Sequence, residues 1–247
     1  MSKKIFIAVV IIIAVFASLF YLFQQRNNKN TNEDTNKTAN IIAQPIISQQ
    51  KITITETERN MIININSVRI IIGSSYSLDS EINKAITQHI ESLKDNFMSA
   101  ATTAAKDNGE TNILNIETEV LLATPRLISL AFTSTKDLAG INNDDPKRTF
   151  MVFNLVNNKM MIEGNEMFRD DLAWSEAVKA MKVFLLADYQ GDPNCDLFFA
   201  PKHNGFTASC IGVDRSRGWR NISLTRNIPI SAIQEFLAPS VLSDIIQ

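Results

Sequence analysis

Two cysteines give the sequence its most specific chemical signal. Cys195 and Cys210 bracket two strand-like runs, and the turn signal at Pro201 to Gly205 lies midway between them. Cysteines equidistant from a hairpin turn face each other across the two strands, close enough to form a disulfide. In an oxidising compartment this bridge would stabilise the fold by about 3 kcal/mol. The alternative is two independent buried thiols. A zinc site is less well supported, because only His203 lies nearby and zinc needs three or four ligands.

A second cluster combines positive charge with an aromatic ring. Arg215, Arg217 and Arg220 surround Trp219, and Arg226 follows a few residues later. Guanidinium groups beside an indole suit an anionic glycan, an acidic protein or lipid headgroups, with Trp219 as the anchor. The alternative is a solvated loop beside a strand whose tryptophan is half buried.

The remaining titratable residues form no catalytic constellation. His89 and His203 are far apart in the sequence, and neither belongs to a triad or to a string of metal ligands. The acidic pair Asp144-Asp145 lies in a polar loop without calcium-ligand spacing. The pair Asp170-Asp171 is explained as negative charge at a helix N-terminus. We therefore expect no enzymatic activity, no cofactor and no metal.

Length and composition limit the class of protein. The chain has 247 residues, of which 45% are hydrophobic, and a formal net charge of −2. These values indicate one ordinary globular domain plus an appendage. Nucleic acid is not expected as a partner, because phosphate binding needs a clustered cationic excess.

The appendage is an apolar run near the N-terminus. Residues 5–23 carry no charge and follow a short basic head, residues 1–4. As a helix at 1.5 Å per residue the run reaches roughly 28 Å, enough to cross a bilayer. We expect a transmembrane helix or signal anchor; a cleavable signal peptide is the alternative, although no small-residue cleavage site follows. Residues 24–50 then predict a flexible polar stalk, and residues 51–247 an extracytoplasmic domain.

Hydrophobic periodicity predicts the elements of that domain. The fold class is α+β, an antiparallel β-sheet packed by two amphipathic helices and preceded by the N-terminal transmembrane helix. A tight hairpin turn is expected at Asn157-Asn158. Leu172, Ala173, Val178, Met181, Phe184 and Leu185 are predicted to face inward on the second helix. The predicted strands are 52–55, 61–65, 68–72, 113–123, 127–132, 149–156, 159–162 and 221–224 with a hairpin at 196–213, and the predicted helices are 79–109, 170–186 and 231–237.

The order of these elements resembles a known bacterial module. Tyr76-Ser-Leu-Asp before Ile82-Asn-x-x-Ile86, Leu127 to Phe132, and Thr149 to Leu155 before Met167-Phe168 carry the resemblance. The Phe-rich hairpin at Asp196 to Phe206 and the ending from Asn221 to Leu237 fit its C-terminal half. The module is the extracytoplasmic domain of unknown function shared by lysozyme-sensing anti-sigma factors and the N-terminal region of a peptidoglycan deacetylase. The chain departs from its pattern at Leu138 to Asn143, so no residue role transfers there.

The resemblance implies a function in the bacterial cell envelope. We expect a membrane-anchored extracytoplasmic binding or sensor domain without enzymatic activity, whose ligand is a lysozyme-like protein or peptidoglycan. The cluster of charge around Trp219, and not the resemblance, makes Arg215, Arg217, Trp219 and Arg220 the candidate partner-binding residues. Two alternatives stay open: an envelope glycan hydrolase or deacetylase, and a structural subunit of an envelope assembly.

Overall fold

The structure is a computed structural model that describes residues 44–57, 60–73, 76–104, 111–139, 146–156, 159–160 and 165–246. All of them belong to one compact unit, Ile42–Gln247. The predicted transmembrane segment 5–23, most of the predicted stalk and the Asn157-Asn158 turn lie outside the described residues. Among the helices within these ranges, none is both long enough and apolar enough to cross a bilayer.

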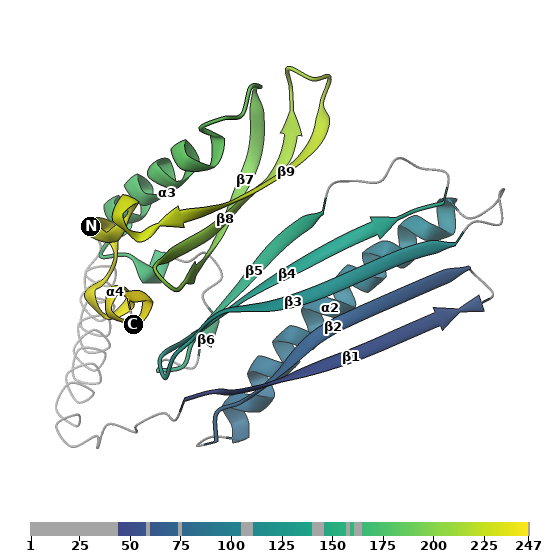
Figure 1. The fold of residues 1–247 in the computed structure, drawn as a ribbon, viewed down its shortest axis with the longest axis horizontal. Coiled ribbons are helices and arrows are strands. Elements are labelled where there is room, and N and C mark those ends of the chain that lie inside the picture. The colour runs from purple at the N-terminus through teal and green to yellow at the C-terminus, as the bar shows by residue number, and fades with distance from the viewer. Residues whose placement is uncertain are drawn as a thin grey trace, which may run out of the picture. The chain divides into compact units, whose positions relative to one another are not determined.

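The described residues form an α+β fold with two β-sheets (Figure 1). One sheet has the strand order β1-β2-β3-β4-β5-β6, and the other has the order β7-β8-β9. The strands are β1 Ile46–Glu56, β2 Met61–Ile71, β3 Asn112–Ala123, β4 Leu127–Asp137, β5 Lys147–Asn154, β6 Lys159–Met160, β7 Pro193–Lys202, β8 Gly205–Asp214 and β9 Arg220–Pro229. The helices are α2 Tyr76–Ala104, α3 Asp171–Leu186 and α4 Pro239–Ile246, with short 3₁₀ turns η2 Asn165–Met167, η3 Ile230–Ala232 and η4 Gln234–Phe236.

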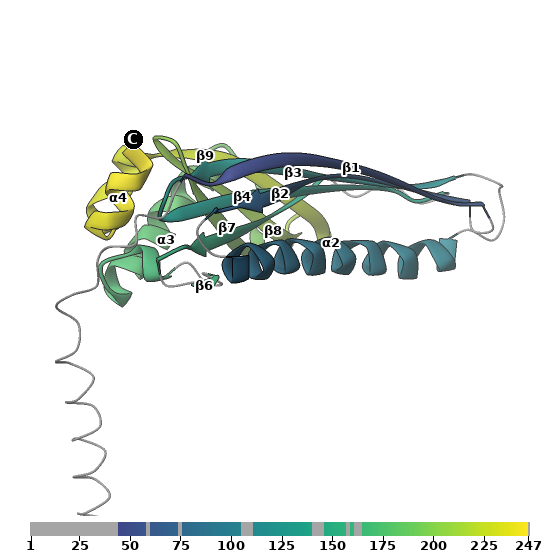
Figure 2. The same ribbon diagram turned by 90° about the horizontal axis from the view of Figure 1, so that it is seen from below.

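The six-stranded sheet is mixed, which corrects the prediction of a single antiparallel sheet. Strands β2 and β3 run parallel, with Met61 opposite Asn112, while the other neighbouring pairs are antiparallel. A parallel pair needs a crossover connection, and α2 supplies it. Figure 2 shows α2 lying along one face of this sheet. Strand β1 begins at Ile46, so its pairing with β2 already includes the end of the predicted stalk.

Strand β4 separates two hydrophobic cores. Its even-numbered residues, among them Ile128 and Phe132, join the core under α2, which also contains Ile86 and Phe97. Its odd-numbered Ala131 joins a second core, built from the three-stranded sheet, α3 and the C-terminal elements. Because side chains alternate between the faces of a strand, one strand can supply both cores.

The inner face of α3 differs from the prediction. Ala173, Met181 and Leu185 are buried as expected, but Leu172 is 71% exposed and Phe184 is 42% exposed. The buried positions continue through Ala177 at spacings of four residues, which define a narrow stripe. Leu172 and Phe184 each lie one residue away from that stripe, so the prediction for these two side chains was wrong.

The C-terminal helix was predicted too early in the chain. Residues 231–237 fall mostly in the 3₁₀ turns η3 and η4, and the α-helix starts at Pro239. Ile233 breaks the regular pattern between these turns with φ −138° and ψ −1°. Proline suits the first turn of a helix because its fixed φ is helical and its missing N–H has no partner there.

Asn83 joins α2 to the edge of β2. Its side-chain oxygen accepts from the Ile70 N–H at 2.9 Å, and its side-chain nitrogen donates to the Ile70 carbonyl at 2.7 Å. One helical turn earlier, Asp79 accepts from the Ile72 N–H at 2.7 Å. The paired register with β3 ends at Asn66, so these side chains replace a neighbouring strand for the last part of β2.

We expect the substitution Asn83→Leu to lower the free energy of unfolding by about 2 to 3 kcal/mol. The leucine leaves the Ile70 N–H and carbonyl without partners at a partly buried position. Urea unfolding at constant pH measures the loss. Thr87→Val is the matched control one turn later, because exposed Thr87 donates to the Asn83 carbonyl of its own helix. Equal stability of both variants would contradict this role of Asn83.

Candidate functional site

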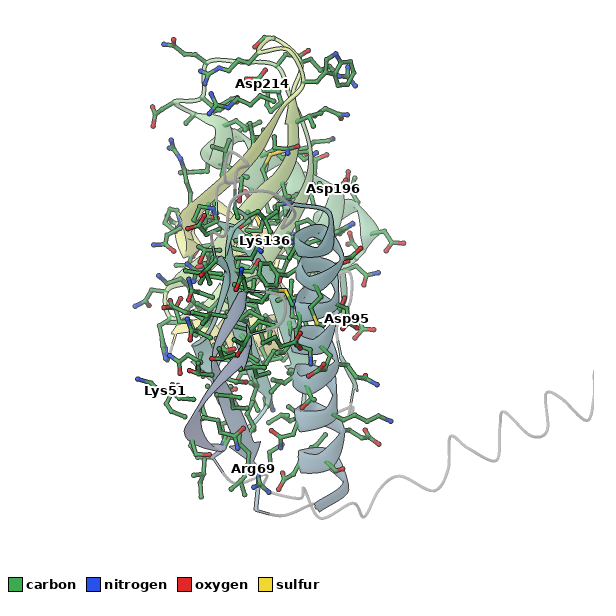
Figure 3. The ribbon with its side chains drawn as sticks, turned by 90° about the vertical axis from the view of Figure 1, so that its right-hand side faces the viewer. Lys51, Arg69, Asp95, Lys136, Asp196 and Asp214 are labelled. Atoms are coloured by element: carbon green, nitrogen blue, oxygen red, sulfur yellow. A yellow bond between two sulfur atoms is a disulfide. The ribbon has the colours of Figure 1, made fainter. Side chains whose placement is uncertain are left out.

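The arginine turn, defined as residues 215–219 together with Arg220 at the start of β9, is the candidate site. It connects β8 to β9, whose register runs from Gly205 opposite Pro229 to Asp214 opposite Arg220. It lies at one end of the three-stranded sheet, beside the segment that enters β7 (Figure 1). Figure 3 shows Asp214 at this end, far from Lys51 and Arg69 of the other sheet.

The disulfide between Cys195 and Cys210 is present on this sheet. The two cysteines are not directly opposite each other as the symmetric hairpin predicted. Cys195 pairs with Gly212, and Cys210 pairs with Leu197. The bridge therefore runs diagonally across β7 and β8, with 5.4 Å between the two Cα atoms.

Gly212 makes room for this diagonal bridge. A Cβ atom at position 212 would lie 2.6 Å from the Cys195 Cα and 2.8 Å from its Cβ. Real Cβ atoms do not approach other carbon atoms so closely, and backbone cannot shift cheaply to relieve the contact. The missing side chain thus allows Cys195 to lie close to β8 and to reach Cys210.

Asp214 organises the backbone at the base of the arginine turn. Its fully buried carboxylate accepts from the Tyr189 hydroxyl at 2.6 Å and from the Ser216 hydroxyl at 2.7 Å. It also accepts from the N–H groups of Ser216 at 2.9 Å and of Asp192 at 3.2 Å. These bonds tie the turn to the segment before β7. A charged acceptor with several donors gives a strong and rigid network.

The same hydrogen bonds set the acidity of the two partners. The hydroxyl groups of Tyr189 and Ser216 stabilise the charged carboxylate and lower the pKa of Asp214 to about 2. The bond to Asp214 in turn raises the pKa of Tyr189, because loss of the phenolic proton would break it. Asp214 is therefore ionised across the physiological range.

The arginine turn contains three of the four predicted arginines in different states. Arg217 is held by Asp214 at 3.4 Å and by the Gln190 carbonyl at 3.1 Å. The Arg215 guanidinium lies 5.6 Å from the centre of the Trp219 ring. Arg220 is exposed at the start of β9. Arg226 does not join the turn, since it lies further along β9 and pairs with Asp188 at 2.9 Å.

Trp219 has both an exposed ring and an unfavourable backbone conformation. The residue is 66% exposed, and its φ is +63°. Positive φ is uncommon for residues other than glycine and is costly for a bulky one. The preceding Gly218, with φ +72°, adopts the same region without such strain. The fixed base of the turn thus holds a large aromatic ring outside the core.

We expect Trp219→Gly to leave the stability unchanged or to raise it by about 1 kcal/mol. Glycine relieves a strain of order 1 to 3 kcal/mol, offset in part by its greater freedom in the unfolded chain. Thermal unfolding of the two proteins measures the difference. A loss of several degrees in Tm would show that the indole stabilises the turn and that strain is not stored there.

The histidines occupy unrelated places. His89 on α2 contacts the Thr149 hydroxyl at 2.9 Å and the edge of Phe132, and burial lowers its pKa. His203 is exposed in the turn between β7 and β8. In the part of the chain that the structure describes, no group of three or more His, Cys, Asp or Glu side chains could hold a metal ion.

Two features were not predicted from the sequence: the contact between Asp214 and Tyr189 at the end of β8, and a groove beside α2. Asp214 and Tyr189 carried no motif, because their contact depends on how the loop before β7 folds over the end of β8. A groove of about 530 Å³ between β2 and the first turns of α2 was also not predicted; its lining includes Arg69, Lys84 and Thr87. No periodicity signals this groove, since it forms where β2 and β3 diverge.

Comparison with known proteins gives structural similarity only. No protein-family model matches the chain, and no curated protein matches it. The crystal structure of a DUF3298 family member from Bacteroides fragilis is similar over 84% of this chain and 99% of its own, with 15% identity and a TM-score of 0.48. A DUF3298 family protein from Pseudomonas aeruginosa is similar over 81% of this chain and 98% of its own, with 14% identity and a TM-score of 0.49.

Proposed function

We propose that the chain is a membrane-anchored extracytoplasmic binding or sensor domain of the bacterial cell envelope and that it is not an enzyme. The observation that carries this proposal is the arginine turn, where a buried network fixes the backbone from which exposed cationic and aromatic side chains project. A preorganised backbone that carries such side chains favours binding, because less entropy is lost when a ligand arrives.

The disulfide and the apolar segment 5–23 support the location. Disulfides persist in oxidising compartments and are rare in the cytoplasm. A stretch of 19 uncharged residues at the start of the chain is suited to anchoring the protein in a bilayer. An anchored domain on the outer side of the membrane would meet peptidoglycan and secreted proteins, which are the proposed ligands.

Binding of the full chain in mild detergent to purified peptidoglycan sacculi and to a lysozyme tests the proposal. We expect the wild-type chain to bind one of the two ligands. The variant Arg215→Gln/Trp219→Gly/Arg220→Gln should bind about tenfold more weakly or worse, since it loses two charges and the aromatic ring. Arg226→Gln is the control on the same strand, because Arg226 lies outside the arginine turn. Equal binding by wild type and triple variant, or no binding at all, would contradict the proposal.

A further inference from the structure

The arginine turn has a distribution of charge that suits one class of ligand. Its end of the sheet carries Arg215, Arg217 and Arg220 together with Asp192 and Asp214. Arg217 is committed to Asp214. Within the described ranges, Arg215 and Arg220 form no ion pair, so two guanidinium groups remain to meet a ligand. Each can bind a carboxylate with two parallel hydrogen bonds.

Trp219 separates these two arginines in the sequence and adds an apolar surface between them. Its ring is 66% exposed while Arg215 lies 5.6 Å from the ring centre. An exposed indole beside unpaired guanidinium groups combines a stacking surface for a flat ring with charged donors at its border. A sugar ring that carries a carboxylate has both matching features.

We propose that the arginine turn binds an acidic glycan, with a sugar ring against Trp219 and carboxylates at Arg215 and Arg220. This inference rests on the proposed function and names the ligand class of the same site. The glycan carries its carboxylates on the sugar rings themselves.

Two observations favour an acidic glycan over a lipid surface. The turn is fixed by the four hydrogen bonds to Asp214, and a preorganised turn favours one specific stacked complex over loose partition into headgroups. The chain as a whole has a net charge of −2, so general attraction to anionic surfaces is weak. Recognition must then come from the local arrangement of side chains.

Calorimetric titration of the full chain in mild detergent tests the inference with three probes. The probes are a hexamer of galacturonic acid, a neutral glucose hexamer, and vesicles that contain phosphatidylglycerol. We expect the acidic hexamer to bind at least about tenfold more tightly than the neutral one, because the charged hydrogen bonds are lost with the latter. The variants Arg215→Gln/Arg220→Gln and Trp219→Gly should each weaken acidic binding about tenfold, and Arg226→Gln should leave it unchanged.

The results separate this inference from the proposed function. Equal affinity for both hexamers, or dependence on the arginines without dependence on Trp219, overturns the acidic glycan. Binding to the vesicles that depends on Trp219, without binding to the acidic hexamer, assigns the turn to a lipid surface and also overturns it. If the chain binds sacculi or lysozyme but not the acidic hexamer, only the inference fails. If it binds none of these, both fail.

Discussion

Replacing both Cys195 and Cys210 with alanine is expected to lower the free energy of unfolding by about 3 kcal/mol. The disulfide joins β7 to β8 across a sequence separation of 15 residues and so lowers the conformational entropy of the unfolded chain. It also fixes the strand that leads into the Asp214 network at the far end of β8. Urea unfolding of the oxidised wild type and of the double variant measures the loss. Alanine is the suitable replacement, because Cys210 is only 1% exposed and a serine hydroxyl there would lack a partner.

Reduction of the wild-type protein provides the control for this result. A reductant should shift the unfolding midpoint of the wild type and leave that of the double alanine variant unchanged. A wild-type unfolding midpoint that does not respond to the reductant would mean that the disulfide does not stabilise the protein by lowering the conformational entropy of the unfolded chain. Gly212→Ala offers an independent check, because a methyl group at this position would collide with Cys195 and oppose the diagonal bridge.

Asp214→Asn is expected to destabilise the protein more than any single substitution of the turn arginines. The asparagine keeps the size of the side chain but replaces one acceptor oxygen with a donor, which then faces the donors of Tyr189 or Ser216. Burial makes such a mismatch costly. Thermal unfolding at neutral pH measures the effect. Asp196→Asn, at an exposed position of β7, is the matched control and should be close to neutral.

The stability that the ionised Asp214 carboxylate contributes depends on pH in a defined way. The pKa of this carboxyl falls from an ordinary value of 3.8 to about 2 in the folded protein. The ionised group therefore adds stability that is fully present above pH 4 and is lost as the pH falls toward about 2. The difference in Tm between wild type and Asp214→Asn should shrink over this interval. A difference that stays constant between pH 5 and pH 2 would contradict the network around Asp214.

Local patterns predicted most of the elements, because local periodicity reports which face of an element is buried. The apolar stripe of α2, including Ile82, Ile86 and Phe97, lies in the core, and the hairpin of β7 and β8 is present with its disulfide. The runs 61–65 and 68–72 were predicted as separate strands, but they form the single strand β2. Buried residues have odd numbers up to Ser67 and even numbers from Val68 on, so the alternation is interrupted within the strand. In the sequence this interruption resembles the end of one strand and the start of another.

The pairing of strands was beyond reach of local patterns. Strands β2 and β3 run parallel because α2 crosses over between them. The three-stranded sheet is separate, and it packs in a core that also contains residues of β4 and α3. These are contacts between residues far apart in the chain. The diagonal disulfide shows the same limit on a smaller scale, since the offset of two residues follows from the register of β7 and β8 and from the space at Gly212.

Only the part of the candidate site that is local in sequence could be predicted. Arg215, Arg217, Trp219 and Arg220 are adjacent in the sequence, so their common turn could be inferred. Their different states could not, because only the folded chain brings Tyr189 and the Gln190 carbonyl to the turn. Their role in binding stays a prediction.

The proposed envelope function requires that the domain lies outside the membrane with its disulfide formed, where the arginine turn can meet an envelope ligand. Thiol labelling of intact cells with an impermeant reagent, with and without reductant, tests this location. We expect Cys195 and Cys210 to be unreactive at first and both to react in intact cells once reductant is added. Two free thiols that the reagent reaches only after lysis would place the domain in the cytoplasm, and the proposed envelope function would be wrong.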